Sequence, residues 1–174
     1  MFSKINVLHI VKSQVGTWID DSTGNKKIGD FVLFIGGPVL VGLLLTFFLK
    51  VALETDLITL LATILSIVSA LLFNLLILIF DISGKNEEKL KNENNRLAEL
   101  LKQIYINISF SIVVSIAALI VVVLAYFSFW PGIIYDLLRF LAFGLITLFL
   151  LTLFMILKRI DILLFEDFKR YEKK

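Results

Sequence analysis

The stretch that decides the fold is QIYINISFSIVVSIAALIVVVLAYFSFWPGIIY (residues 103–135), which contains no charged side chain. A helix needs about 20 apolar residues to cross the hydrocarbon core of a bilayer, so this run is too long for one crossing. The segment SFWPG (residues 128–132) interrupts it, because Pro-Gly ends helices and Trp favours the membrane interface. The run therefore predicts one transmembrane helix over residues 104–127 and the start of another over residues 134–157.

Two further uncharged runs lie upstream, over residues 31–49 and residues 57–80, and each is bounded by charged residues on both sides. Each is long enough to cross a bilayer as a helix. We therefore predict an all-α integral membrane protein with four transmembrane helices. The fourth of these helices consists mostly of Leu and Phe, and we expect it to be the most exposed to lipid.

The composition excludes a water-soluble protein. Hydrophobic residues make up 59% of the 174 residues, charged residues only 18%, and the mean hydropathy is +0.94. A soluble domain carries about 25% charged residues, and a chain of this length cannot hide so many apolar side chains from water. With no Cys, one His and no HExxH or GxSxG motif, we expect no cofactor, no metal site and no enzymatic activity.

The basic residues predict the orientation of the chain. Of the 17 Lys and Arg residues, all except Lys50 and Arg139 fall within residues 1–30, 81–103 and 158–174. The positive-inside rule then places both termini and the middle loop in the cytoplasm, in a cell inner (plasma) membrane. We expect Arg139 to pair with Asp136, three residues earlier, and to reach the lipid headgroups. Acidic residues alternate with these basic ones, so we expect no direct binding of nucleic acid.

The three cytoplasmic segments have amphipathic patterns. Residues 1–30 begin with an amphipathic stretch that we expect to lie on the inner leaflet or against a partner, and residues 81–103 form a charged, helix-favouring loop. Residues 158–174 form an amphipathic tail. Apolar side chains repeat at helical spacing in the loop and the tail, which indicates either helices covered by the rest of the chain or a docking site for a cytosolic protein partner. The candidate docking residues are Leu90, Leu97, Leu101, Phe165, Phe168 and Tyr171.

Small and weakly polar side chains recur at helical spacing inside two of the predicted spans. In lipid such stripes mark places where helices touch, and in an oligomer they can also line a hydrated pore. Both interpretations remain open for Thr63, Ser66, Asn74, Asn107, Ser111 and Ser115. In the first span, Gly36, Gly37 and Pro38 permit a close helix contact and a kink. The absence of an ionisable residue at mid-membrane argues against an ion-coupled transporter.

A compact four-span chain with both ends inside, no catalytic groups and an amphipathic cytoplasmic face resembles the membrane component of Kiwa-type anti-phage defence systems. The resemblance covers the whole chain in size, span number and topology. It implies a homo-oligomeric inner-membrane sensor that holds a cytosolic, DNA-binding effector. Two alternatives remain from the residues alone: a holin-like or channel-forming effector that permeabilises the membrane, and a structural scaffold of a membrane complex.

Overall fold

The computed structural model describes residues 10, 11, 13, 14, 32–85, 95–127 and 131–171, and in this part of the chain the regular structure is entirely helical. Side chains are described for these residues except 82, 83, 85, 95–98 and 166–171. The helical elements are η1 (Val32–Gly36), α3 (Gly37–Leu43), η2 (Leu44–Phe48), α4 (Thr55–Lys85), α6 (Asn95–Tyr126) and α7 (Gly132–Tyr171). Because η1, α3 and η2 follow one another without a break, we refer to Val32–Phe48 as the first apolar helix.

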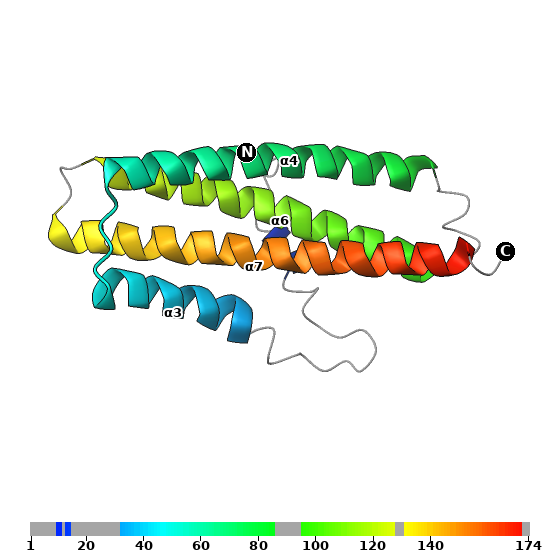
Figure 1. Ribbon diagram of the computed structural model, residues 1–174, viewed down its shortest axis with the longest axis horizontal. Coiled ribbons are helices and arrows are strands. Elements are labelled where there is room, and N and C mark those ends of the chain that lie inside the picture. The colour runs from blue at the N-terminus through cyan, green and yellow to red at the C-terminus, as the bar shows by residue number, and fades with distance from the viewer. Residues whose placement is uncertain (1–9, 12, 15–31, 86–94, 128–130, 172–174) are drawn as a thin grey trace, which may run out of the picture.

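The helices lie side by side in a row (Figure 1). α6 packs against both α4 and α7, and the first apolar helix packs against α7. We call the end of the bundle where α4 and α7 begin the Arg139 end, and the end where α7 finishes the tail end. This order makes α6 and α7 inner helices, whereas α4 has a helix on one side only.

Three of the helices are long and apolar enough to cross a membrane, over Thr55–Asp81, Glu99–Tyr126 and Gly132–Phe165. The first apolar helix is shorter, and its predicted start at residue 31 lies outside the described residues. The protein is therefore an all-helical membrane protein, as the composition predicts. The number of four crossings stays a prediction, because the fourth crossing depends on this shorter helix.

The long helices extend beyond the predicted spans at the tail end of the bundle. α4 continues to Lys85, α6 begins at Asn95, and α7 runs without interruption to Tyr171. The reason is composition: these extensions contain mostly good helix formers and no proline. Much of the loop 81–103 and most of the tail 158–174 are thus continuations of the long helices rather than separate elements.

The expectation that the fourth span is the most exposed is wrong. In the most apolar stretch of each helix, the buried share is 50% for α6, 28% for α7 and 17% for α4. The physical reason is the order of the row, because α7 has a neighbour on both sides. A sequence of Leu and Phe does not distinguish a lipid-facing surface from a helix–helix surface, since both are apolar.

Glycines allow the first apolar helix to approach α7 closely. A Cβ atom added at Gly42 would lie 3.0 Å from the backbone carbonyl oxygen of Phe140, and one added at Gly144 would lie 3.5 Å from the carbonyl oxygen of Pro38. These two contacts show that the helices run antiparallel. At the predicted kink the helix changes from a π-helix to an α-helix. The π-helix η1 ends at Gly36, and α3 starts at Gly37 with Pro38 in its first turn.

The contact at Gly42 gives a test of this packing. We expect Gly42→Ala to lower the melting temperature of the detergent-purified protein, because the new methyl group meets backbone that must shift, at a cost of about 1–3 kcal/mol. Gly144→Ala is the matched control, since its Cβ would make an ordinary van der Waals contact. Alanine favours a helix over glycine by about 1 kcal/mol, so Gly144→Ala should be neutral or stabilising. Equal effects of the two substitutions would contradict the packing.

Candidate functional site

Hydroxyl groups join α6 to both of its neighbours inside the bundle. The Ser69 hydroxyl of α4 lies 2.7 Å from the Ser115 hydroxyl of α6, and the Ser111 hydroxyl of α6 lies 2.8 Å from the Thr152 hydroxyl of α7. Ser111 and Ser115 are one helical turn apart, so a single stripe of α6 contacts both neighbours. This stripe therefore faces the space between α4 and α7.

Each pair ends on a backbone carbonyl. Ser115 donates to the carbonyl of Ile112 (2.8 Å), and Thr152 donates to the carbonyl of Phe149 (2.7 Å). A hydroxyl has one proton to donate, so in each pair one hydroxyl must accept from its partner while it donates to the helix. The result is two short chains in which every proton has an acceptor. That arrangement is what a lipid environment requires, since no water is present to pair with these groups.

The predicted stripe of the 104–127 span is buried within this chain. Asn107 and Ser111 have no exposed surface, and Ser115 is 1% exposed. These residues therefore pack helices together inside one chain and do not line an open pore there. Sequence reasoning did not include Ser69 among the candidate site residues, because it lies off the small-residue stripe of its own helix.

The N-terminal segment contributes a polar residue to the interior. Among the described residues of this segment, Ile10 packs against the main apolar core and the Gln14 side chain is fully buried. Figure 1 shows the blue fragment about midway along the bundle. Ile10 therefore packs on the bundle itself, and not on the inner leaflet or a partner as the sequence predicted for this segment. Most of residues 1–30 lies outside the described part.

The polar stripe of α4 points the opposite way. Thr63, Ser66 and Asn74 are exposed, whereas the buried residues of α4 lie on the other side of the helix. The hydroxyls of Thr63 and Ser66 donate to carbonyls of their own helix, those of Thr59 (2.8 Å) and Ala62 (2.7 Å). In the described part of the chain the Asn74 amide has no such partner. The stripe therefore leaves one strongly polar group directed away from the bundle.

Arg139 forms a second polar centre, at the Arg139 end. Its guanidinium lies 3.0 Å from Asp136 Oδ1 and donates to the carbonyl of Val51 (2.6 Å) and to that of Thr46 (3.4 Å). The guanidinium carbon also lies 5.6 Å from the centre of the Tyr135 ring. The predicted pairing with Asp136 is confirmed, but Arg139 is only 8% exposed and does not reach outward to headgroups. It binds the connection between the first apolar helix and α4 to the start of α7.

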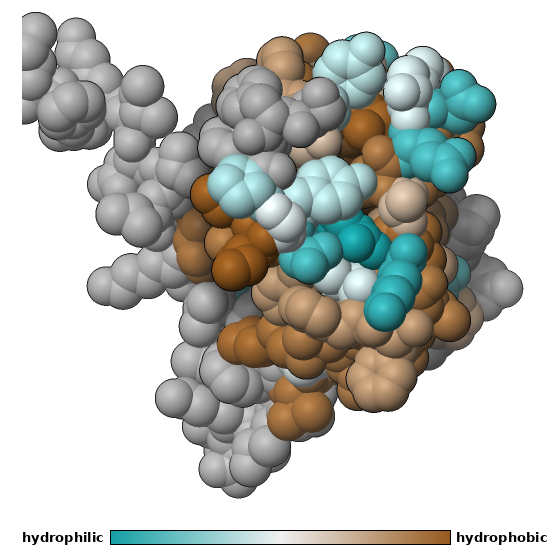
Figure 2. All heavy atoms as spheres, turned by 90° about the vertical axis from the view of Figure 1, so that its left-hand side faces the viewer, coloured by the Kyte–Doolittle hydropathy of each residue, from teal (hydrophilic) through white to brown (hydrophobic). Residues whose placement is uncertain are grey.

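This connection is held by several bonds. The Leu53 amide donates to the Tyr135 hydroxyl (3.3 Å), and the Val51 amide donates to the Leu45 carbonyl (3.0 Å). Lys50 adopts a φ of 48°, a conformation that costs energy for a residue with a Cβ and persists where surrounding contacts fix it. Figure 2 looks onto this end, where a small group of hydrophilic side chains is surrounded by hydrophobic ones.

The predicted docking residues divide into three groups. Leu101 is 6% exposed and belongs to the main apolar core, so its assignment to partner docking is wrong: it covers the interior of its own bundle. Phe165 is 59% exposed near the tail end. The side chains of Leu97, Phe168 and Tyr171 are not described, and Leu90 lies outside the described residues, so these four stay predictions.

Within the described residues, no group of three or more His, Asp or Glu side chains is arranged to hold a metal ion. Comparisons of the chain with protein-family models, curated proteins and solved structures found no match.

Proposed function

We propose that the protein is a non-enzymatic, oligomeric inner-membrane protein that anchors a cytosolic protein partner and acts as a sensor in anti-phage defence. The single observation that carries the proposal is the polar stripe on the outer face of α4, which supports self-association. In this proposal both termini lie in the cytoplasm, as the distribution of Lys and Arg favours. The defence role rests on the resemblance in size, span number and topology to the Kiwa-type membrane component.

The outer face of α4 has the chemistry of a helix–helix interface. Among its small and polar members, Thr63 and Asn74 lie opposite the side that packs on α6, and Ser66 lies on the adjoining exposed flank. An amide left in lipid without a partner costs free energy, and side chains such as Asn form hydrogen bonds between membrane helices. A second copy of α4 supplies both a donor and an acceptor for Asn74. Lipid covers the rest of the outer surface.

The tail end supports the docking of a partner. α7 continues past Lys158 as far as Tyr171, and Phe165, the last residue of its apolar stretch, lies exposed on the predicted cytoplasmic tail. A large exposed aromatic side chain in such a tail is typical of a binding anchor, because a few such residues carry most of the energy of an interface. Phe165 is thus the described residue with which the proposed docking can be tested.

The α4 stripe also favours the alternative in which an oligomer conducts. If several copies turned this face toward a common axis, its hydroxyl and amide groups would line a hydrated path, as in a holin-like effector. Leakage of a small dye from vesicles that contain the purified protein separates the two functions. An anchor leaves the vesicles tight, whereas a channel releases the dye.

Because the chain contains no cysteine, single cysteines can map the oligomer contact directly. We expect Asn74→Cys and Ser66→Cys to give disulfide-linked dimers on mild oxidation in membranes, since both lie on the proposed interface. Ile64→Cys is the control: it is 48% exposed but lies about 120° around the helix from the middle of the stripe. The measurement is non-reducing gel electrophoresis. Equal crosslinking at residues 64 and 74 would contradict an interface along this stripe.

The docking part has a separate test in cells that carry the chain with its neighbouring reading frames. We expect the wild-type chain to reduce phage plating and Phe165→Ala to lose that protection, because truncation of an aromatic anchor weakens binding by about tenfold or more. The neighbouring substitution Leu164→Ala should retain protection, since it removes a smaller exposed side chain. Crosslinking through residue 74 should persist in both variants. Full protection by Phe165→Ala would exclude this residue as the anchor.

A further inference from the structure

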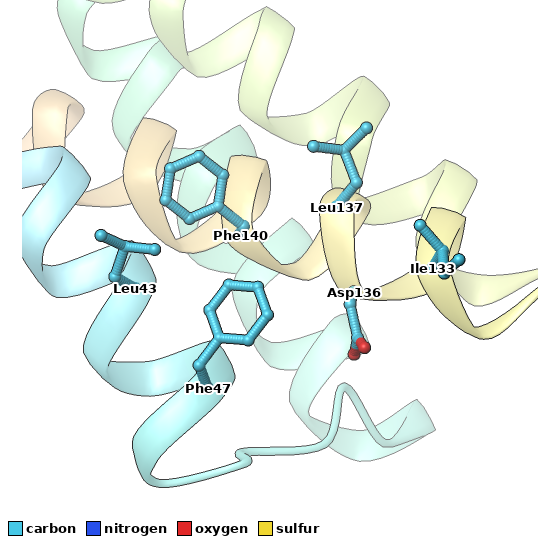
Figure 3. A pocket seen from close by; sticks show the side chains of 6 residues that line it. All are labelled: Leu43, Phe47, Ile133, Asp136, Leu137 and Phe140. Carbon is cyan, nitrogen blue, oxygen red and sulfur yellow. The ribbon is translucent and has the colours of Figure 1, made fainter.

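A groove opens between the first apolar helix and the start of α7 (Figure 3). Its volume is about 450 Å³, which lies within the range of small-molecule sites in proteins. One wall comes from Leu43 and Phe47, and the other comes from Ile133, Asp136, Leu137 and Phe140. In Figure 3 the rings of Phe47 and Phe140 lie beside the opening, and the Asp136 carboxylate lies between Phe47 and Ile133 in this view. The groove is thus apolar except for a single acidic group.

The ion pair at this groove is asymmetric. The Arg139 side chain is 9% exposed and that of Asp136 is 46% exposed, so the cation lies behind the anion. Arg139 also donates to the Val51 carbonyl and contacts the Tyr135 ring, so much of its charge is directed into the protein. The guanidinium nitrogen Nη1 of Arg139 donates a hydrogen bond to Oδ1 of Asp136. The charge presented to the groove is therefore that of a carboxylate, which favours a cationic ligand group.

The position of the groove along the bundle indicates what kind of ligand enters it. It lies at the Arg139 end of the bundle, the end at which the charged residues Lys50 and Asp56 bound the apolar runs of the first apolar helix and α4. This is the level at which a bilayer changes from acyl chains to headgroups. From there the first apolar helix and α7 run together toward mid-membrane, so Leu43 lies deeper than Phe47. A ligand with a polar head at the interface and an apolar chain below it matches this layout.

We propose that this groove binds one acyl chain of a lipid whose headgroup carries an ammonium group, with that group beside Asp136. An ammonium forms a charge-assisted hydrogen bond with the carboxylate. A lipid with a net negative headgroup brings like charge to the same place and is disfavoured. The inference requires only that the protein lies in a membrane, and it is independent of the defence role.

Native mass spectrometry of the purified protein tests the inference. The probe is an equimolar mixture of phosphatidylethanolamine and phosphatidylglycerol with identical acyl chains, added to the protein in detergent. We expect adducts of the first lipid to exceed those of the second by about two- to fivefold, the range of a partly exposed ion pair. Equal amounts of the two adducts would overturn the proposal.

Two substitutions separate the headgroup contact from the chain contact. Asp136→Asn should abolish the preference between the two lipids, whereas Asp161→Asn, an exposed acid toward the other end of α7, should retain it. Leu43→Trp should reduce adducts of both lipids because it fills the groove, and Ile120→Trp, 52% exposed on α6, is the control for added bulk. A melting curve checks that each variant is folded.

The remaining outcomes overturn the proposal in distinct ways. If Leu43→Trp and Ile120→Trp bind the same number of lipids, the adducts are general surface lipid and the groove is not the site. If Leu43→Trp instead changes the number of chains in the complex and leaves lipid adducts unchanged, a second copy of the chain occupies the groove.

Discussion

The bundle depends on one constraint: a polar group inside a bilayer has no water to bond and must find its partner in protein. α6 carries such groups along one face, and the structure places that face between α4 and α7. Hydrogen bonds join Ser115 to Ser69 of α4 and Ser111 to Thr152 of α7, so the same stripe of α6 contacts both neighbouring helices. Individual hydrogen bonds between membrane helices contribute only about 0.6 kcal/mol on average. Their effect here is to specify which face of α6 is inside.

The same constraint explains the Arg139 end. A buried guanidinium needs acceptors for its donors, and here Asp136 and the carbonyls of residues 46 and 51 accept from the two terminal nitrogens, whereas Nε has no partner among the described residues. The connection between the first apolar helix and α4 is therefore tied to α7 by a side chain and not only by apolar packing. One consequence is that the carboxylate of Asp136 faces the groove. The two members of this ion pair thus have different roles: Arg139 holds the connection to α7, and Asp136 lines the proposed lipid site.

Helices could be predicted from the sequence better than the direction in which each helix face points. The Pro-Gly break in the uncharged run 103–135 agrees with the end of α6 at Tyr126 and the start of α7 at Gly132, and Asn107, Ser111 and Ser115, which share one face by their spacing, are buried. The same kind of spacing in α4 shows which residues share a face but carries no information on where that face points. Leu101 was assigned to partner docking for the same reason. A leucine that packs inside its own bundle has the same periodicity as one that binds another protein.

Proximity of Ser69 and Ser115 tests the central claim, that the small polar face of α6 lies between its two neighbours. In the cysteine-free chain, Ser69→Cys combined with Ser115→Cys places two thiols where the hydroxyl oxygens lie 2.7 Å apart. Oxidation followed by denaturation and thiol labelling should leave this pair unlabelled, through a disulfide within one chain. The pair Thr63→Cys and Ser115→Cys is the control, because Thr63 faces away from the bundle, and it should form no disulfide within one chain. Full labelling of the 69–115 pair, or an internal disulfide between residues 63 and 115, would contradict the arrangement.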